Sequence, residues 1–191
     1  MNIIDFLTLL LVNMAGGLFL LSLFVYRGLG YENQKNWTPG FLIAGFIALI
    51  NGLWVMWNWP LPGSYNVAYG EMSVLFGILF LAFGFSLLKD LDLFSITIYA
   101  LFCGVSATVI GVRIINLGMT KTPLISGVGF ILTGLIGVFS YPILRLKKYK
   151  TLRIIMAIII LLIAMQWAYT GYLAYWDHLS TFSKWVPITM K

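Results

Sequence analysis

The feature that most constrains this chain is a series of long apolar segments separated by short polar ones. Each apolar segment has the length of about 20 residues that an α-helix needs to cross a bilayer. Hydrocarbon offers no partners to backbone N–H and C=O groups, so a crossing segment of this kind is expected to be helical. The sequence predicts six spans, at Ile3–Tyr26, Phe41–Trp59, Ala68–Leu88, Leu93–Arg113, Thr122–Leu144 and Thr151–Tyr175.

Composition points to the same class of protein. Of the 191 residues, 61% are hydrophobic and only 9% are charged, whereas soluble domains carry about 25% charged residues. A chain this short cannot bury so much apolar surface in a core of its own. We therefore predict an all-α membrane protein, a six-transmembrane-helix bundle in which residues 1–191 form one domain of the cell membrane.

The Lys and Arg residues near the span ends predict the orientation of the chain. Eight of them fall on one side of the membrane and four on the other when the connections are assigned alternately. Because cytoplasmic loops are enriched in basic residues, the side with eight is expected to be cytoplasmic and both termini extracytoplasmic. The net charge of +6 is concentrated between Arg145 and Arg153, as in a cytoplasmic loop, so we expect no nucleic-acid partner.

The inventory of reactive side chains argues against an enzyme, and we expect neither a cofactor nor a metal. One histidine and one cysteine cannot form a typical zinc site, a bis-histidine haem site or an iron–sulfur cluster. The phosphate-binding pattern Gly-x-x-x-x-Gly-Lys is absent from the sequence. His178 lies at the edge of the last predicted span, and its spacing pairs it with no nucleophile.

Charged residues at the span ends are candidates for function, because charges are costly near hydrocarbon. Glu71 and Arg113 fall at similar depths near the extracytoplasmic boundary, on spans joined by a short connection. An ion pair there would offset part of the desolvation of each charge. The pair either locks two helices together or lines a charged vestibule for a polar solute. Asn116 lies at the same boundary and is a candidate for the same vestibule.

Two asparagines lie deeper, Asn13 and Asn51, near the middle of the first and second predicted spans. An amide at this depth needs a hydrogen-bond partner, which is either a neighbouring helix or a narrow wet path. Trp57 and Tyr69 belong to an aromatic stretch that is typical of an interfacial belt and that would also narrow such a path.

Small residues recur at intervals of four on several predicted spans. This spacing lets helix backbones approach closely, either within the bundle or between subunits. The clearest series are Ala44, Ala48 and Gly52 on the second span and Cys103, Ala107 and Gly111 on the fourth.

Several motifs carry a resemblance to known families. The chain resembles, over nearly its whole length, a family of small, uncharacterised, six-span prokaryotic membrane proteins. The resemblance implies the fold given above and no specific function. The segments that carry it are Leu11–Gly17, Trp59–Asn66, Tyr69–Glu71, Leu75–Gly77 and Val112–Gly118.

The layout is also similar to that of the bacterial urea and short-chain amide channels. The residues that carry this resemblance are Asn13 before a glycine pair, Asn51, and Tyr69-Gly70 followed by Leu75-Phe-Gly77. The resemblance implies a homo-oligomer, hexameric in that family, with a pore through each protomer. The Trp-rich fifth span of those channels is replaced here by a glycine-rich segment, so their urea filter cannot be carried over.

Three functions fit these observations. The first is a passive channel or transporter for a small neutral solute, urea-like or amide-like, across the cytoplasmic membrane. Selectivity would come from pore width and a few hydrogen-bonding groups. The second is a non-transporting accessory subunit that binds a partner protein or lipid, and the third is a lipid-binding or small-molecule-binding protein. The pore or ligand residues expected are Asn13, Asn51, Trp57, Tyr69, Glu71, Arg113 and Asn116.

Overall fold

The computed structural model describes residues 6–31 and 33–183, and every regular element in them is helical. The all-α prediction is therefore confirmed for this part of the chain. The predicted first span begins at Ile3, and residues 3–5 lie outside the described residues. The elements in chain order are α1 (Phe6–Leu23), η1 (Phe24–Gly28), η2 (Gln34–Trp37), α2 (Thr38–Asn58), η3 (Asn66–Glu71), α3 (Met72–Lys89), α4 (Phe94–Leu117), α5 (Pro123–Val138), α6 (Ser140–Arg145), η4 (Leu146–Lys148) and α7 (Lys150–Phe182).

Five continuous helical segments are long and apolar enough to cross a membrane, and the predicted fifth span is a broken helix. The axis turns by 56° between Pro123–Val138 and Ser140–Lys148. Pro142 accounts for this bend, because proline has no N–H for the carbonyl of Val138 and its ring collides with that carbonyl. The prediction of six spans is met only if this bent pair is counted as one span.

Helix α7 is longer than the sequence suggested. The predicted span ends at Tyr175, where polar residues begin, but the helix continues to Phe182. Residues 176–182 include neither glycine nor proline, so nothing in them interrupts the backbone hydrogen bonds. Hydropathy therefore located the apolar part of the segment and not the end of the helix.

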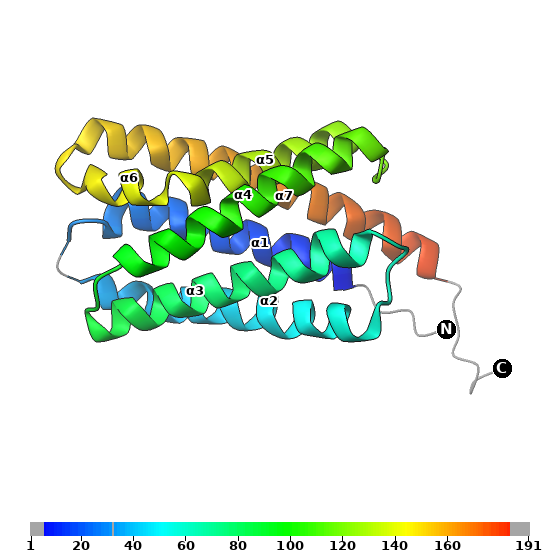
Figure 1. Cartoon of the computed structure of the whole chain (residues 1–191), viewed down its shortest axis with the longest axis horizontal. Helices are drawn as coiled ribbons and strands as arrows, with labels where there is room; N and C mark the ends of the chain where they lie inside the picture. The colour runs from blue at the N-terminus through cyan, green and yellow to red at the C-terminus, as the bar shows by residue number, and fades with distance from the viewer. Residues whose placement is uncertain (1–5, 32, 184–191) are drawn as a thin grey trace.

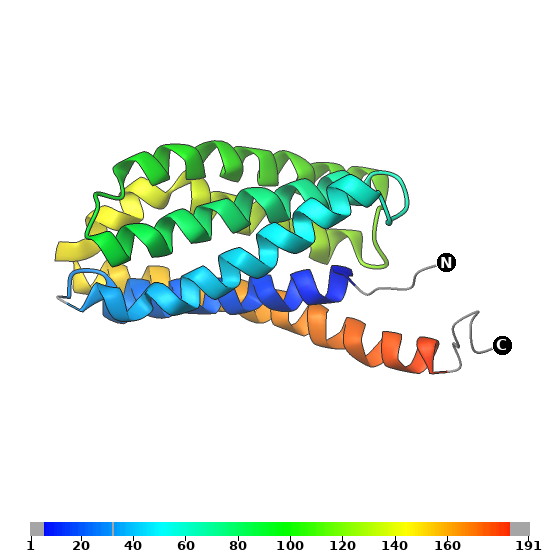
Figure 2. The same ribbon diagram turned by 90° about the horizontal axis from the view of Figure 1, so that it is seen from below.

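The long helices form three antiparallel pairs. We call each pair a hairpin, including α1–α7, whose two helices are not consecutive in the chain. The closest packing joins α4 with α5, α2 with α3, and α1 with α7, so the first and last helices also form a pair. Figures 1 and 2 show the three hairpins lying side by side along a common long axis. Packing between different hairpins is sparser than packing within each one.

Small residues repeat every seven positions where α2 meets α3. A side-chain carbon at Gly45 would lie 2.7 Å from the backbone nitrogen of Leu81, and one at Gly77 would lie 2.5 Å from that of Leu49. Only glycine allows such an approach. A seven-residue repeat keeps these positions on one face of a slightly supercoiled pair. The stripe consists of Thr38, Gly45 and Gly52 on α2, with Gly70, Gly77 and Gly84 on the facing segment.

The same spacing recurs in the other two hairpins. A side-chain carbon at Gly111 on α4 would lie 2.6 Å from the carbonyl oxygen of Gly127 on α5. In the α1–α7 pair, the Ser22 hydroxyl donates to the carbonyl oxygen of Ala157 at 2.7 Å. The close packing predicted from small residues is thus confirmed. The stripes are Thr97, Gly104, Gly111, Gly127 and Gly134 in α4–α5, and Thr8, Ala15, Ser22, Ala157, Ala164 and Gly171 in α1–α7.

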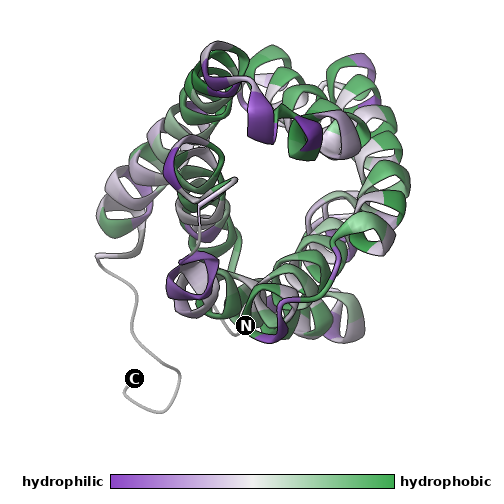
Figure 3. Cartoon of the chain, turned by 90° about the vertical axis from the view of Figure 1, so that its left-hand side faces the viewer, coloured by the Kyte–Doolittle hydropathy of each residue, from purple (hydrophilic) through white to green (hydrophobic). Residues whose placement is uncertain are grey.

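The two ends of the bundle differ in charge. The α1–α2, α3–α4 and α6–α7 connections lie together at one end, on the left of Figure 1, and we call this the basic end. Figure 3 looks along the bundle from the basic end and shows hydrophobic residues over most of the length of the helices. The eight Lys and Arg residues grouped by the sequence lie there: Arg27, Lys35, Lys89, Arg145, Lys147, Lys148, Lys150 and Arg153.

Candidate functional site

The two deep asparagines bond to backbone carbonyls. Nδ2 of Asn13 donates to the carbonyl oxygen of Ala44 at 2.9 Å, which ties α1 to α2. Nδ2 of Asn51 donates to the carbonyl oxygen of Ile47, one turn back on its own helix, at 2.8 Å. Neither asparagine lines the interior cavity described below. Of the two roles considered for Asn13, the structure places it in the helix-to-helix contact.

The other candidates, Tyr69 excepted, are on the surface. Glu71, Arg113 and Asn116 are all exposed, and the Trp57 side chain is 77% exposed. The predicted ion pair between Glu71 and Arg113 is absent from the part of the chain that the structure describes, where the ion pairs are Lys35–Asp90 and Lys121–Asp177. The sequence argument took helices joined by a short connection to be close neighbours. In fact α3 packs mainly on α2, and α4 mainly on α5.

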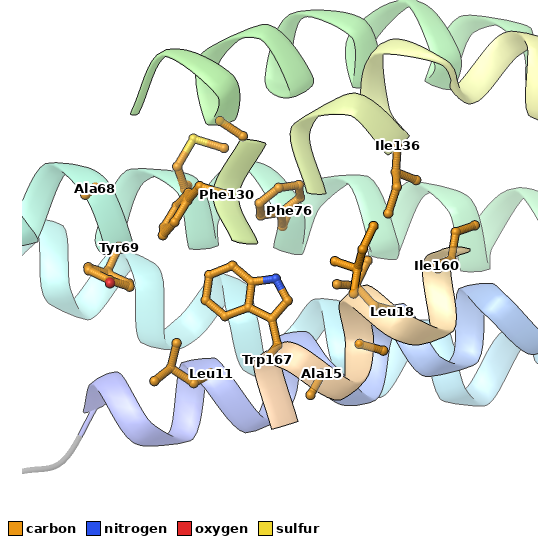
Figure 4. Close-up of a cluster of buried hydrophobic side chains, with 14 of the residues drawn as sticks. Leu11, Ala15, Leu18, Ala68, Tyr69, Phe76, Phe130, Ile136, Ile160 and Trp167 are labelled. Atoms are coloured by element: carbon orange, nitrogen blue, oxygen red, sulfur yellow. The ribbon is translucent and has the colours of Figure 1, made fainter. Parts of the chain in front are cut away.

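Tyr69 is the predicted candidate that lies inside the bundle. Its ring stacks on Tyr65 at 6.0 Å and meets the edge of Phe130 at 5.4 Å between ring centres. Phe130 in turn packs edge-to-face with Trp167 at 5.3 Å. Figure 4 shows Tyr69, Phe130 and Trp167 converging from three different segments, and we call these three residues the aromatic plug.

The polar atoms of the aromatic plug lie near hydroxyl groups within the protein. Nε1 of Trp167 donates to Oγ1 of Thr133 at 2.8 Å, and both residues are buried. The Tyr69 hydroxyl lies near Ser126, whose Oγ accepts the Thr120 hydroxyl at 3.0 Å. An aromatic edge-to-face contact contributes about 0.5–1.5 kcal/mol beyond its buried area. The plug therefore packs part of the core in the half of the bundle away from the basic end.

Next to the aromatic plug, towards the basic end, lies an interior cavity of about 120 Å³. Its wall is formed almost entirely by aliphatic and aromatic side chains from all three hairpins. The polar residues in the wall are Thr97, Thr133 and Ser140. Thr97 donates to the Phe94 carbonyl, Ser140 donates to the Thr97 carbonyl, and Thr133 accepts from Trp167. The cavity therefore presents few free hydrogen-bonding groups to any occupant.

The cavity exists because the hairpins meet through large side chains. Within each hairpin the seven-residue stripes of small residues bring backbones together, whereas Leu18, Phe76, Ile136 and Ile160 stand between the hairpins (Figure 4). Protein interiors usually hold few voids larger than a water molecule, and here the space between the three pairs is left partly unfilled. Sequence reasoning missed Phe130, Trp167 and the cavity. The available signal was Trp167, the single tryptophan within the predicted sixth span.

Other polar residues on the helices bond to backbone carbonyls. Nε2 of Gln166 donates to the Ile125 carbonyl at 3.1 Å, and the Thr170 hydroxyl donates to the Gln166 carbonyl at 3.0 Å. Among residues 6–31 and 33–183, no group of three or more His, Cys, Asp or Glu side chains is arranged to hold a metal ion. The polar side chains of the bundle are thus mostly bonded to backbone carbonyls, and Oε1 of Gln166 is a buried atom without a hydrogen-bond partner.

Comparison with known proteins gives one family. A family model described as "Protein of unknown function (DUF981)" matches residues 1–181, and the chain belongs to this family. No curated protein and no solved structure matches the chain. The resemblance to an uncharacterised family is thereby confirmed. The resemblance to urea and amide channels stays a prediction.

Proposed function

We propose that the chain is a multi-pass protein of the cytoplasmic membrane whose interior cavity binds an apolar small molecule or a lipid chain. The single observation that carries this proposal is the apolar cavity of about 120 Å³ between the three hairpins. The membrane part of the proposal is supported by the outward side chains, since Phe102, Ile43 and Leu162 are each at least 60% exposed. In water such a surface would aggregate. The positive-inside bias supports a cytoplasmic basic end and extracytoplasmic termini.

The chemistry of the cavity wall selects for an apolar occupant. An engineered cavity of about 150 Å³ lined by Leu, Ile and Phe stays dry and accepts benzene or xenon. The cavity here has a similar size and lining. A urea-like solute would leave its water partners and find only three hydroxyls in the wall, of which Thr97 and Ser140 already donate to carbonyls and Thr133 already accepts from Trp167. An unpaired buried polar group costs about 1–3 kcal/mol on mutational scales. An alkyl chain meets no such cost.

The passive channel remains the second candidate, and one observation favours it. A smaller void of about 20 Å³ touches the aromatic plug, and it shares Met14, Phe76 and Thr133 with the wall of the larger cavity. The two spaces are therefore neighbours around the plug. Displacement of Trp167 or Phe130 would join them. If the chain is a channel, we expect a homo-oligomer with one such path in each protomer.

Photolabelling from the lipid phase tests the binding proposal. The chain is reconstituted into vesicles that contain a lipid with a diazirine near the end of its acyl chain, and peptide mass spectrometry locates the adducts. We expect adducts at cavity residues such as Ile136 and Ile143, besides those on the outer faces. Ile136→Trp fills the cavity and should remove the interior adducts. Leu135→Trp, at the neighbouring position that is 37% exposed, is the matched control and should leave them.

Two results would argue against binding. Adducts confined to outward residues would show that lipid chains do not enter the bundle. Fast swelling of the same vesicles in urea, amides or glycerol, slowed by Ile136→Trp but not by Leu135→Trp, would favour the channel instead. In that case the cavity is part of a solute pathway through the protein, and the aromatic plug gates that pathway.

A further inference from the structure

A cleft at the basic end adjoins the interior cavity. It encloses about 830 Å³ between the α1–α2 connection, the α3–α4 connection and the α6–η4 segment. Two of its wall residues, Leu93 and Leu144, also line the interior cavity. The rest of the cleft is much more polar than the cavity. These two leucines therefore stand between the apolar cavity and a polar space at the predicted cytoplasmic face.

The acidic groups of this basic-end cleft are already engaged. A carboxylate oxygen of Asp90 lies 2.5 Å from Nζ of Lys35, which gives a surface ion pair. Oδ1 of Asp92 accepts the backbone N–H of Phe94 at 2.7 Å and so caps the start of α4. Neither carboxylate forms an ion pair with the basic residues on the opposite wall.

The basic groups on that opposite wall have no acidic partner. Arg145 lies over the Tyr141 ring at 4.9 Å, and its Nε donates to the Tyr141 hydroxyl at 3.0 Å. Within the described ranges no carboxylate lies at ion-pair distance from Arg145, Lys147 or Arg153. Arginine offers a planar fork of donors that fits the oxygens of a phosphate. The cleft thus presents two cations without an ion-pair partner, on the wall opposite Asp90 and Asp92 and next to an apolar cavity.

Arg153 behind the cleft strengthens the case for an anion. Its side chain is buried, at 7% exposure, and Nη1 donates to the carbonyl oxygen of Leu29, a cleft residue, at 2.5 Å. Its Nε has no hydrogen-bond partner. Lys147 and Arg153 both flank Gly30, where a side-chain carbon would lie 2.8 Å from Cγ of Lys147 and 3.5 Å from Nη1 of Arg153. A buried cation without a counter-charge is costly, so an anion in the cleft would relieve it.

From this juxtaposition we propose that the basic-end cleft binds the phosphate headgroup of an amphiphile whose alkyl chain occupies the interior cavity. The inference rests on the proposed function and narrows its ligand to an anionic, phosphate-bearing lipid. Arg145 and Lys147 contact the phosphate, and Arg153 adds positive potential from behind. Leu93 and Leu144 contact the chain where it leaves the cavity.

The test uses two photoreactive probes with the same diazirine chain, an alkyl phosphate and the matching alkyl alcohol, in phosphatidylcholine vesicles. We expect the alkyl phosphate to label the Ile136–Ile143 segment about tenfold more than the alcohol, because each basic residue adds to anion binding. The double variant Arg145→Gln and Lys147→Gln should bring this ratio close to one. The control variant Lys148→Gln and Lys150→Gln removes the same charge from the same loop, outside the cleft, and should keep the preference.

The outcomes separate the two proposals. Equal interior labelling by both probes in the unmodified chain would overturn the headgroup site and leave cavity binding intact. No interior labelling by either probe would overturn cavity binding itself. An equal loss of preference in the control variant would show a general attraction of anions to the loop and would also overturn the site. Loss of the preference in excess inorganic phosphate would identify free phosphate as the ligand, against the amphiphile.

Discussion

The contact within a hairpin and the space between hairpins are built from the same apolar chain, yet they pack in opposite ways. Inside the α2–α3 and α4–α5 pairs, glycines every seven residues let the two backbones approach closely. Between the pairs, large side chains such as Phe76 and Ile136 meet around a cavity. In lipid, where packing replaces the hydrophobic drive between helices, residue size decides which contacts are rigid. We therefore expect each hairpin to be rigid and the space between the hairpins to be adaptable.

The largest effect is expected for a side chain added inside a stripe. Gly77→Ala places a carbon 2.5 Å from the backbone nitrogen of Leu49, so the two helices must separate. We expect a loss of about 2–3 kcal/mol in the free energy of unfolding, as for overpacked cores. Thermal unfolding in detergent, followed by tryptophan fluorescence, measures it. Gly16→Ala, where nothing lies within 4 Å, is the control and should be neutral or slightly stabilising. Equal losses in both would mean that the stripe does not hold the hairpin.

The next effect concerns the aromatic plug. Trp167→Phe removes the indole N–H that donates to Thr133 and leaves a buried hydroxyl short of a partner. We expect a loss of about 1–2 kcal/mol in unfolding free energy. Trp176→Phe changes a side chain that is 78% exposed and should have no measurable effect. If Trp167→Phe is as silent as this control, the two hairpins joined by the plug are not coupled there.

A third variant adds volume at the cavity between the hairpins. We expect this region, unlike a glycine stripe, to tolerate a larger side chain. Ile136→Phe fills part of the cavity and should raise the unfolding free energy by about 0.5–1 kcal/mol in protein freed of lipid. Leu135→Phe faces outward and should leave it unchanged. A loss with Ile136→Phe similar to that of Gly77→Ala would show that the centre is as tightly packed as a stripe.

The smallest effect that we expect is a difference in unfolding free energy between substitutions at Asn13 and at Asn51. Asn13→Leu removes a hydrogen bond between α1 and α2, and such bonds in membrane proteins contribute about 0.6 kcal/mol on average. Asn51→Leu removes a bond within one helix and should be near neutral. Parallel thermal unfolding of the two variants measures the difference. A larger loss for Asn51→Leu would contradict the assignment of its amide to its own helix.

Much of the fold could be predicted because length and apolarity in lipid leave few alternatives. Apart from the C-terminal end of α7, helical segments were located to within a few residues, and Ala44, Gly52 and Gly111 were correctly expected at close contacts. Helix pairing was harder to predict. A short connection suggested that the third and fourth spans were close neighbours, whereas the seven-residue glycine stripes join α2 to α3 and α4 to α5. The broken helix at Pro142 was also missed, because hydropathy ignores backbone geometry.

The candidate site was harder to predict than the fold. Polar residues were taken as markers of function, but Asn13 and Asn51 satisfy backbone carbonyls and Glu71 is exposed. The interior cavity is lined by residues that are individually ordinary, and only their three-dimensional arrangement leaves a space. Tyr69 was placed in the site through its aromatic context. Its partners Phe130 and Trp167 come from distant segments that no spacing in the sequence connects.

Cysteine accessibility in vesicles tests the central claim most directly, namely that the centre of the bundle is apolar and dry. Cys103→Ala removes the single native thiol, and Ile136→Cys then places one in the cavity wall. Leu91→Cys, at a cleft position that is 52% exposed, is the reactive control. With a charged methanethiosulfonate reagent on both sides of the membrane, the account predicts rapid modification of Leu91→Cys and none of Ile136→Cys. Similar rates for the two thiols would contradict it and would establish a water-filled path.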